Sequence, residues 1–159
     1  MLATDGRILP KSKEHFEVAC KNEENIEFHP FAFRTHTHKL GLVVSGYRVD
    51  PETNEWKLIG KGNPQKPQMF YKTVNEMTVK PGDYLAARCT MYNYLDETVR
   101  IGQTGNDEMC NFYIMYYVDR IDHILDKKVC FSAGPPFNYW HYDLFQVPSE
   151  VNIEASKPV

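Results

Sequence analysis

The sequence predicts an all-β fold, either an antiparallel β-sandwich or a jelly roll. Short runs rich in β-branched and aromatic residues are separated by turn-forming segments, and within most runs apolar and polar residues alternate. No series of helical patterns lies between the runs, so nothing supports a parallel sheet. The predicted strands are 28–38, 42–49, 56–60, 68–74, 84–92, 99–102 and 110–118.

The segments between these strands contain residues that favour turns. Loop 50–55 contains Asp, Pro and Asn and is predicted to be the hairpin connection that follows strand 42–49. Pro and Gly interrupt segments 61–67 and 80–83, which therefore separate the next strands. After residue 130 the strand pattern weakens, although the aromatic residues from Tyr139 onward can still pack on the sandwich.

The last predicted strand has two different faces. Side chains alternate along a strand, so Met109, Tyr113, Met115 and Tyr117 point to one side and the even-numbered residues to the other. One face then belongs to a site and the other to the core, or both faces are buried core, which aromatic strands often form. The pattern alone leaves both interpretations open.

Length and charge limit the classes of protein to consider. With 159 residues the chain fits one domain with its own hydrophobic core, which we expect over 1–150, followed by a C-terminal tail over 151–159. The net charge is -3 and no dense basic run is present, so no nucleic-acid partner is expected. No membrane segment is expected either, because no apolar run approaches the roughly 18 to 20 residues that span a bilayer. Residues 1–10 lack the pattern of a signal peptide.

Cys20, Cys89, Cys110 and Cys130 are the four cysteines of the chain. They include no CxxC pair, which argues against a zinc ribbon or a thioredoxin-type motif. Three disulfide pairings are possible in principle. Four buried, reduced thiols in a cytosolic domain are the alternative.

The most informative motif is His36-Thr37-His38. On an extended strand His36 and His38 leave the same face, so that two neutral imidazoles can bind one metal ion while Thr37 points away. With a soft thioether from elsewhere in the fold, such a site would favour copper, and especially Cu(I). Taken singly, a His-x-His pair is often a surface or core feature, and Met109 is typical of a core residue.

Three segments resemble one known family. Residues 34–49 (RTHTHKLGLVVSGYRV), 82–89 (GDYLAARC) and 107–117 (DEMCNFYIMYY) look like the second, catalytic-copper domain of the peptidylglycine alpha-hydroxylating monooxygenases, within the copper type II ascorbate-dependent monooxygenase family. The resemblance runs in order from about residue 20 to residue 157.

This resemblance implies a metal site with one copper ion per chain. By position, His36, His38 and Met109 would be the ligands of the catalytic copper. Such a set leaves an open position for dioxygen, and the weak sulfur ligand stabilises the reduced ion.

Roles in substrate binding also follow from the resemblance. Arg34 would bind the terminal carboxylate of a peptide, a task that suits the planar, two-pronged guanidinium. By alternation Arg34 lies on the same strand face as His36. Asn111 and Tyr113 would contact the same peptide terminus.

The resemblance further implies two disulfides, Cys20 with Cys130 and Cys89 with Cys110. The second bond would anchor the strand that carries Met109. Disulfides and family together imply the secretory pathway, a secretory granule or the extracellular space.

The complete enzymes of the family imply an activity for this domain. Ascorbate is their reductant, dioxygen the co-substrate, and the substrate a glycine-extended peptide that is hydroxylated at the alpha carbon of its C-terminal glycine, on the way to peptide amidation. Their N-terminal electron-transfer copper domain has no counterpart in this sequence, so coupled turnover by this chain alone is not expected. The alternatives are a module that binds copper with little or no turnover, a dopamine- or tyramine-type beta-hydroxylase domain, and a purely structural sandwich.

Overall fold

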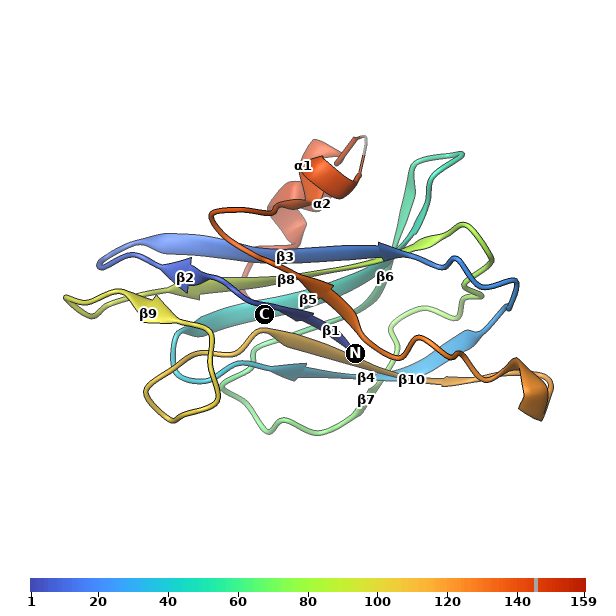
Figure 1. Ribbon diagram of the computed structural model, residues 1–159, viewed down its shortest axis with the longest axis horizontal. Helices are drawn as coiled ribbons and strands as arrows, with labels where there is room; N and C mark the ends of the chain where they lie inside the picture. The colour runs from blue at the N-terminus through green and yellow to red at the C-terminus, as the bar shows by residue number, and fades with distance from the viewer. Residues whose placement is uncertain (145) are drawn as a thin grey trace.

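The computed structural model describes residues 1–144 and 146–159, and it confirms the predicted antiparallel β-sandwich. Two sheets form its layers (Figure 1), a four-stranded sheet in the order β3-β8-β5-β6 and a five-stranded sheet in the order β11-β1-β10-β4-β7. β2 and β9 form a separate small pair. The strands are β1 (Leu2–Thr4), β2 (Arg7–Ile8), β3 (Lys13–Lys21), β4 (His29–His36), β5 (Gly41–Asp50), β6 (Glu55–Gly62), β7 (Tyr71–Lys72), β8 (Tyr84–Tyr92), β9 (Val99–Arg100), β10 (Asn111–Tyr117) and β11 (Cys130–Ser132).

Each predicted strand has a counterpart, but the strands β1, β2, β3 and β11 were not predicted. β8 has the predicted bounds, and β5, β6 and β10 agree with prediction to within two residues. β4 ends at His36, so the expected strand stops before His38, and only two residues of 68–74 form β7. β3 has no counterpart among the predicted strands. Apolar and polar residues do alternate at Phe16, Glu17 and Val18, but all three are buried, so the central charge of this strand faces protein and not solvent.

The inner faces of the two sheets share the main core. Phe16 and Val44 of the four-stranded sheet belong to the same buried cluster as Phe33 and Phe112 of the five-stranded sheet. Gly46 allows the sheets to approach at this point, because a Cβ there would lie 2.3 Å from the Phe112 ring. The sheet that carries β4 and β10 is therefore fixed on its inner side by aromatic packing.

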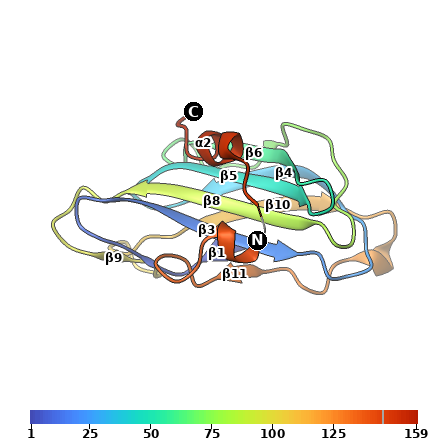
Figure 2. The same ribbon diagram turned by 90° about the horizontal axis from the view of Figure 1, so that it is seen from above.

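The C-terminal region covers the outer face of the four-stranded sheet. Trp140 in α1 (Trp140–Asp143) and Ala155, just after α2 (Ser149–Glu154), are almost fully buried in a second cluster on that face. Figure 2 shows α2 close to β6, and Lys61 of β6 donates to the Glu154 carbonyl at 2.5 Å. The expected tail therefore begins inside a packed helix, and we call residues 146–157 the C-terminal strap. No helix in the described part of the chain is long and apolar enough to cross a bilayer.

A buried arginine, paired with a glutamate of the same sheet, connects the strap to the sheet. Arg88 of β8 donates from Nε to Glu17 Oε1 at 2.6 Å, and its Nη1 donates to the Asn152 carbonyl at 2.7 Å and to Ser156 Oγ at 2.8 Å. The guanidinium also lies 4.4 Å from the centre of the Trp140 ring. The buried charge at the centre of β3 is thus the partner of the arginine that holds the strap.

Both disulfides join one sheet to the other. Cys20 of β3 is bonded to Cys130 of β11, and Cys89 of β8 is bonded to Cys110, the residue before β10. These are the two pairings that the resemblance implies, and no cysteine is free. Four reduced thiols, the alternative left open by the sequence, are not what the structure contains.

Candidate metal centre

His36 and His38 lie side by side at the end of β4. Their ring centroids are 5.4 Å apart and the rings are nearly perpendicular, at 84°. β4 pairs with β10 so that Asn111 lies opposite His36, and Asn111 Nδ2 is 3.9 Å from the sulfur of Met109. The three residues expected as metal ligands are therefore gathered at one end of the β4 and β10 pair, although His38 follows the end of β4 and Met109 precedes the start of β10, so that neither lies on a strand as expected.

Each imidazole is oriented by a hydrogen bond at Nδ1. His38 Nδ1 lies 2.8 Å from the backbone carbonyl oxygen of Asp107, and His36 Nδ1 contacts Oε1 of Gln68. The Gln68 amide is fixed in this orientation because its Nε2 donates to the carbonyls of Thr37 at 3.1 Å and Pro64 at 2.8 Å. Both partners can only accept, so each Nδ1 carries a hydrogen, and in the neutral imidazole Nε2 then has the lone pair that can bind a metal ion.

This set of donor atoms fits copper. Within residues 1–144 and 146–159, no group of three or more His, Cys, Asp or Glu side chains is arranged to hold a metal ion. A metal at this end of the sheet would therefore depend on two imidazoles and the Met109 thioether. Soft sulfur with imidazole suits Cu(I) and does not suit the hard cations, which prefer oxygen.

The residues expected to bind substrate share the same outer face of the sheet. Tyr113 lies opposite Arg34, two residues along the strands from the Asn111 and His36 pair. The Arg34 guanidinium carbon is 5.5 Å from the centre of the Tyr113 ring, and Asn111 Nδ2 donates to the Tyr113 hydroxyl at 3.3 Å. Arg34 Nε is buried and has no hydrogen-bond partner in the described part of the chain, so the guanidinium has donor capacity for an anion.

Two residues that the sequence analysis gave no role also shape this region. Gln68 orients His36, and Glu108 bonds to the backbone of the loop that carries His38. Glu108 lies in the Glu-Met-Cys run that carries the resemblance, whereas no sequence signal marks Gln68. Gly41 is required because a Cβ at this position would lie 2.0 Å from Thr37 Oγ1.

The matching family model and three similar proteins are all described as monooxygenases. Residues 1–143 match the family model described as copper type II ascorbate-dependent monooxygenase, C-terminal domain. The chain is 45% identical over 156 residues to a peptidyl-glycine alpha-amidating monooxygenase of Mus musculus and 41% identical over 156 residues to that of Rattus norvegicus, and each alignment covers 96% of the chain. It is 41% identical to peptidyl-glycine alpha-amidating monooxygenase A of Xenopus laevis over 151 residues, or 92% of the chain. In each case the chain spans 15% of the relative's length.

Proposed function

Because this chain belongs to the copper type II ascorbate-dependent monooxygenase family, we propose that it is the catalytic-copper domain of a peptidylglycine alpha-hydroxylating monooxygenase. The relatives named as alpha-amidating monooxygenases are much longer than the chain, and in this proposal hydroxylation requires the remainder of such a protein. An N-terminal electron-transfer copper domain is the partner that we propose, with ascorbate as the reductant.

In this proposal one copper ion is held by Nε2 of His36, Nε2 of His38 and the sulfur of Met109. The observation that carries it is the hydrogen bonding at both Nδ1 atoms, which leaves the two Nε2 atoms as the free ligand atoms. When bound, copper would supply the one-electron chemistry by which dioxygen is activated.

The protein's own side chains would bind and orient the peptide. Arg34 would donate two parallel hydrogen bonds to the terminal carboxylate, and Asn111 and Tyr113 would hold the same terminus on the outer face of β4 and β10. Two residues along a strand span about 7 Å. A carboxylate on Arg34 would therefore leave the adjoining alpha carbon of a C-terminal glycine near the histidines.

The proposal also concerns the cellular compartment in which the protein acts. Two disulfides fit an oxidising compartment. We propose the secretory pathway, with a secretory granule or the extracellular space as the place of action.

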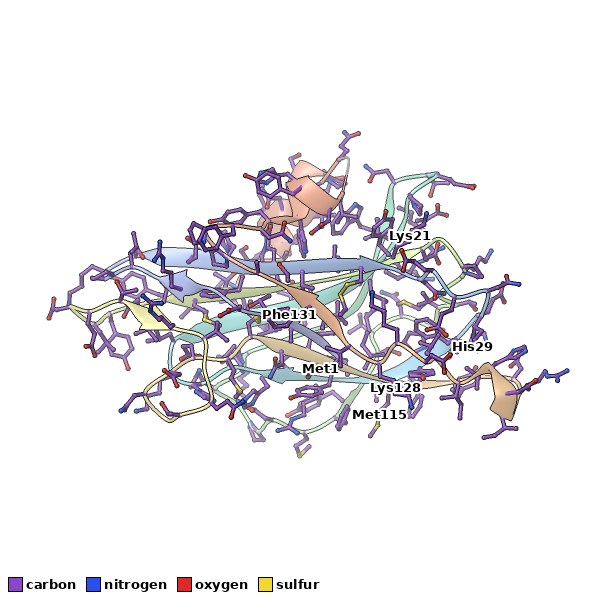
Figure 3. The ribbon with its side chains drawn as sticks, in the orientation of Figure 1. Met1, Lys21, His29, Met115, Lys128 and Phe131 are labelled. Carbon is purple, nitrogen blue, oxygen red and sulfur yellow. A yellow bond between two sulfur atoms is a disulfide. The ribbon has the colours of Figure 1, made fainter. Side chains whose placement is uncertain are left out.

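Copper stoichiometry and X-ray absorption on the ascorbate-reduced protein would test the metal site. We expect one copper per chain with a sulfur scatterer at about 2.3 Å, a typical metal–sulfur distance, and loss of that scatterer in Met109→Ala. Met115→Ala is the matched control, because Met115 lies on β10 and points away from the sandwich interior (Figure 3). No copper, or a sulfur signal unchanged in Met109→Ala, would contradict the ligand set.

Binding of a glycine-extended peptide would test the substrate assignment. Arg34→Met should weaken binding about 10- to 100-fold, as expected for the loss of a charge-assisted pair of hydrogen bonds, while the copper content stays the same. Unchanged affinity, or a preference for a phenethylamine, would favour an amine beta-hydroxylase domain instead.

A further inference from the structure

Glu108 is a buried carboxylate whose hydrogen bonds all lead toward the candidate metal centre. Its side chain is only 2% exposed. It forms no ion pair in the described part of the chain, and three backbone N–H groups donate to it. They belong to His38 (to Oε2, 2.7 Å), Leu40 (to Oε1, 2.6 Å) and Met109 (to Oε2, 3.2 Å). The carboxylate thus replaces water as the partner of backbone groups that no strand satisfies.

These bonds join two segments that are distant in the sequence. The N–H groups of His38 and Met109 donate to the same oxygen atom, so the backbones of two expected copper ligands are held around one point. The preceding residue adds a further link, because the Asp107 carbonyl oxygen accepts from His38 Nδ1. Three consecutive residues, Asp107, Glu108 and Met109, therefore orient an imidazole, fix a loop and supply a thioether.

The backbone of Glu108 is itself fixed on both sides. Its N–H donates to the Arg100 carbonyl at 2.9 Å, and its own carbonyl accepts from the Gly102 N–H at 2.9 Å. Two residues later, Cys110 is bonded to Cys89 in the opposite sheet. A carboxylate on such a backbone can hold the loop 37–40, which belongs to no strand and whose only backbone bond to a strand in the described part of the chain runs from the Tyr92 N–H to the Leu40 carbonyl, at 3.0 Å.

We propose that Glu108 is a positioning residue, which holds His38 and Met109 at the separation that one copper ion requires before the ion binds. The inference rests on the proposed copper site, but it concerns the metal-free protein as well. It predicts that the loop 37–40 is already ordered without copper. It also predicts that loss of the carboxylate changes the copper affinity more than it changes the free energy of unfolding.

The test uses Glu108→Gln, which keeps the shape but replaces one accepting oxygen by an NH2 group. Glu17→Gln is the matched control, since Glu17 is also a buried carboxylate that accepts a backbone N–H, from Trp140 at 2.7 Å, on the far side of the four-stranded sheet. We expect Glu108→Gln to bind Cu(I) about 10- to 100-fold more weakly in a competition with a chelator and to lose sulfur scattering. Glu17→Gln should keep wild-type copper binding.

Wild-type affinity and sulfur scattering in Glu108→Gln would overturn the proposal, as would equal losses in both variants. If Glu108→Gln does not fold, hydrogen exchange of the copper-free wild-type protein tests the proposal instead. The amides of His38, Leu40 and Met109 should be protected, and exchange at the rate of an open loop would also overturn it. Absence of copper from the wild-type protein would instead contradict the proposed function, and the exchange data would still decide whether Glu108 orders the loop.

Discussion

Replacing Arg88 by Met should destabilise the protein strongly and release the C-terminal strap. The substitution keeps an apolar stem of similar length but removes the guanidinium, which is buried between the strap and β8. Glu17 would then keep only the Trp140 N–H as a partner, and the Asn152 carbonyl would lose its donor. Breaking a buried ion pair by removing one partner costs about 3 to 5 kcal/mol, and we expect a loss of that size in the free energy of unfolding.

Arg48→Met provides the matched control. Arg48 is also buried in the four-stranded sheet, where it donates to Asp83 at 2.8 Å and to Glu55 at 2.9 Å, and within the described part of the chain its hydrogen bonds and ion pairs do not involve the strap. Both variants should therefore lose stability in urea unfolding. Only Arg88→Met should also increase hydrogen exchange at Ala155, whose N–H donates to the Val151 carbonyl at 2.8 Å within the strap.

Two results would refute this reasoning. If Arg88→Met lowered the free energy of unfolding by less than about 1 kcal/mol, the Arg88 pair would contribute no more than an exposed ion pair does. Equal protection of Ala155 in both variants would show that Arg88 does not hold the strap. The double variant Glu17→Leu with Arg88→Met should recover part of the loss, because it leaves no buried charge without a partner.

Three further predictions concern disulfides, acid stability and imidazole orientation. Reducing both disulfides should lower the free energy of unfolding, by about 3 kcal/mol for the bond with a separation of 21 residues and about 5 kcal/mol for the one with 110, if chain entropy dominates; an unchanged urea midpoint under thiol would contradict this. Burial, with nearby Arg88 and Lys13, lowers the pKa of His15 from 6.5 to about 4. The unfolded chain therefore takes up the proton first, and stability should fall as the pH decreases below 6.5. After allowance for solvent screening we expect about 1 to 2 kcal/mol by pH 5, and His15→Asn should flatten the curve in that range. Gln68→Leu should weaken Cu(I) binding about 10- to 100-fold, whereas Gln103→Leu, at an exposed position, should not.

The sequence predicted most strands because their alternation survives in regions with one polar face. β3 was not predicted although Phe16, Glu17 and Val18 alternate, and the structure buries its central charge against the Trp140 N–H and Arg88, a contact that no local pattern encodes. The cysteine pattern left three pairings open, and only the family resemblance selected the pairing that the structure contains.

The candidate metal centre was predictable only in part. His36 and His38 form a visible motif, but Met109 is distant in the sequence and entered through the resemblance. The roles of Gln68 and Glu108 depend on contacts across 32 and 70 residues, which no local pattern encodes. Such contacts arise from the pairing of β4 with β10 and from the loops at its end.

The bond between Cys20 and Cys130 has a mechanical consequence. It closes a loop that contains residues 21–129, and His36, His38 and Met109 all lie within this loop. A force that pulls on the two ends of the chain would pass from one end to the other through the disulfide. Only residues 1–19 and 131–159 could lengthen under that force. The candidate copper ligands would carry no tension until the sulfur–sulfur bond itself was broken.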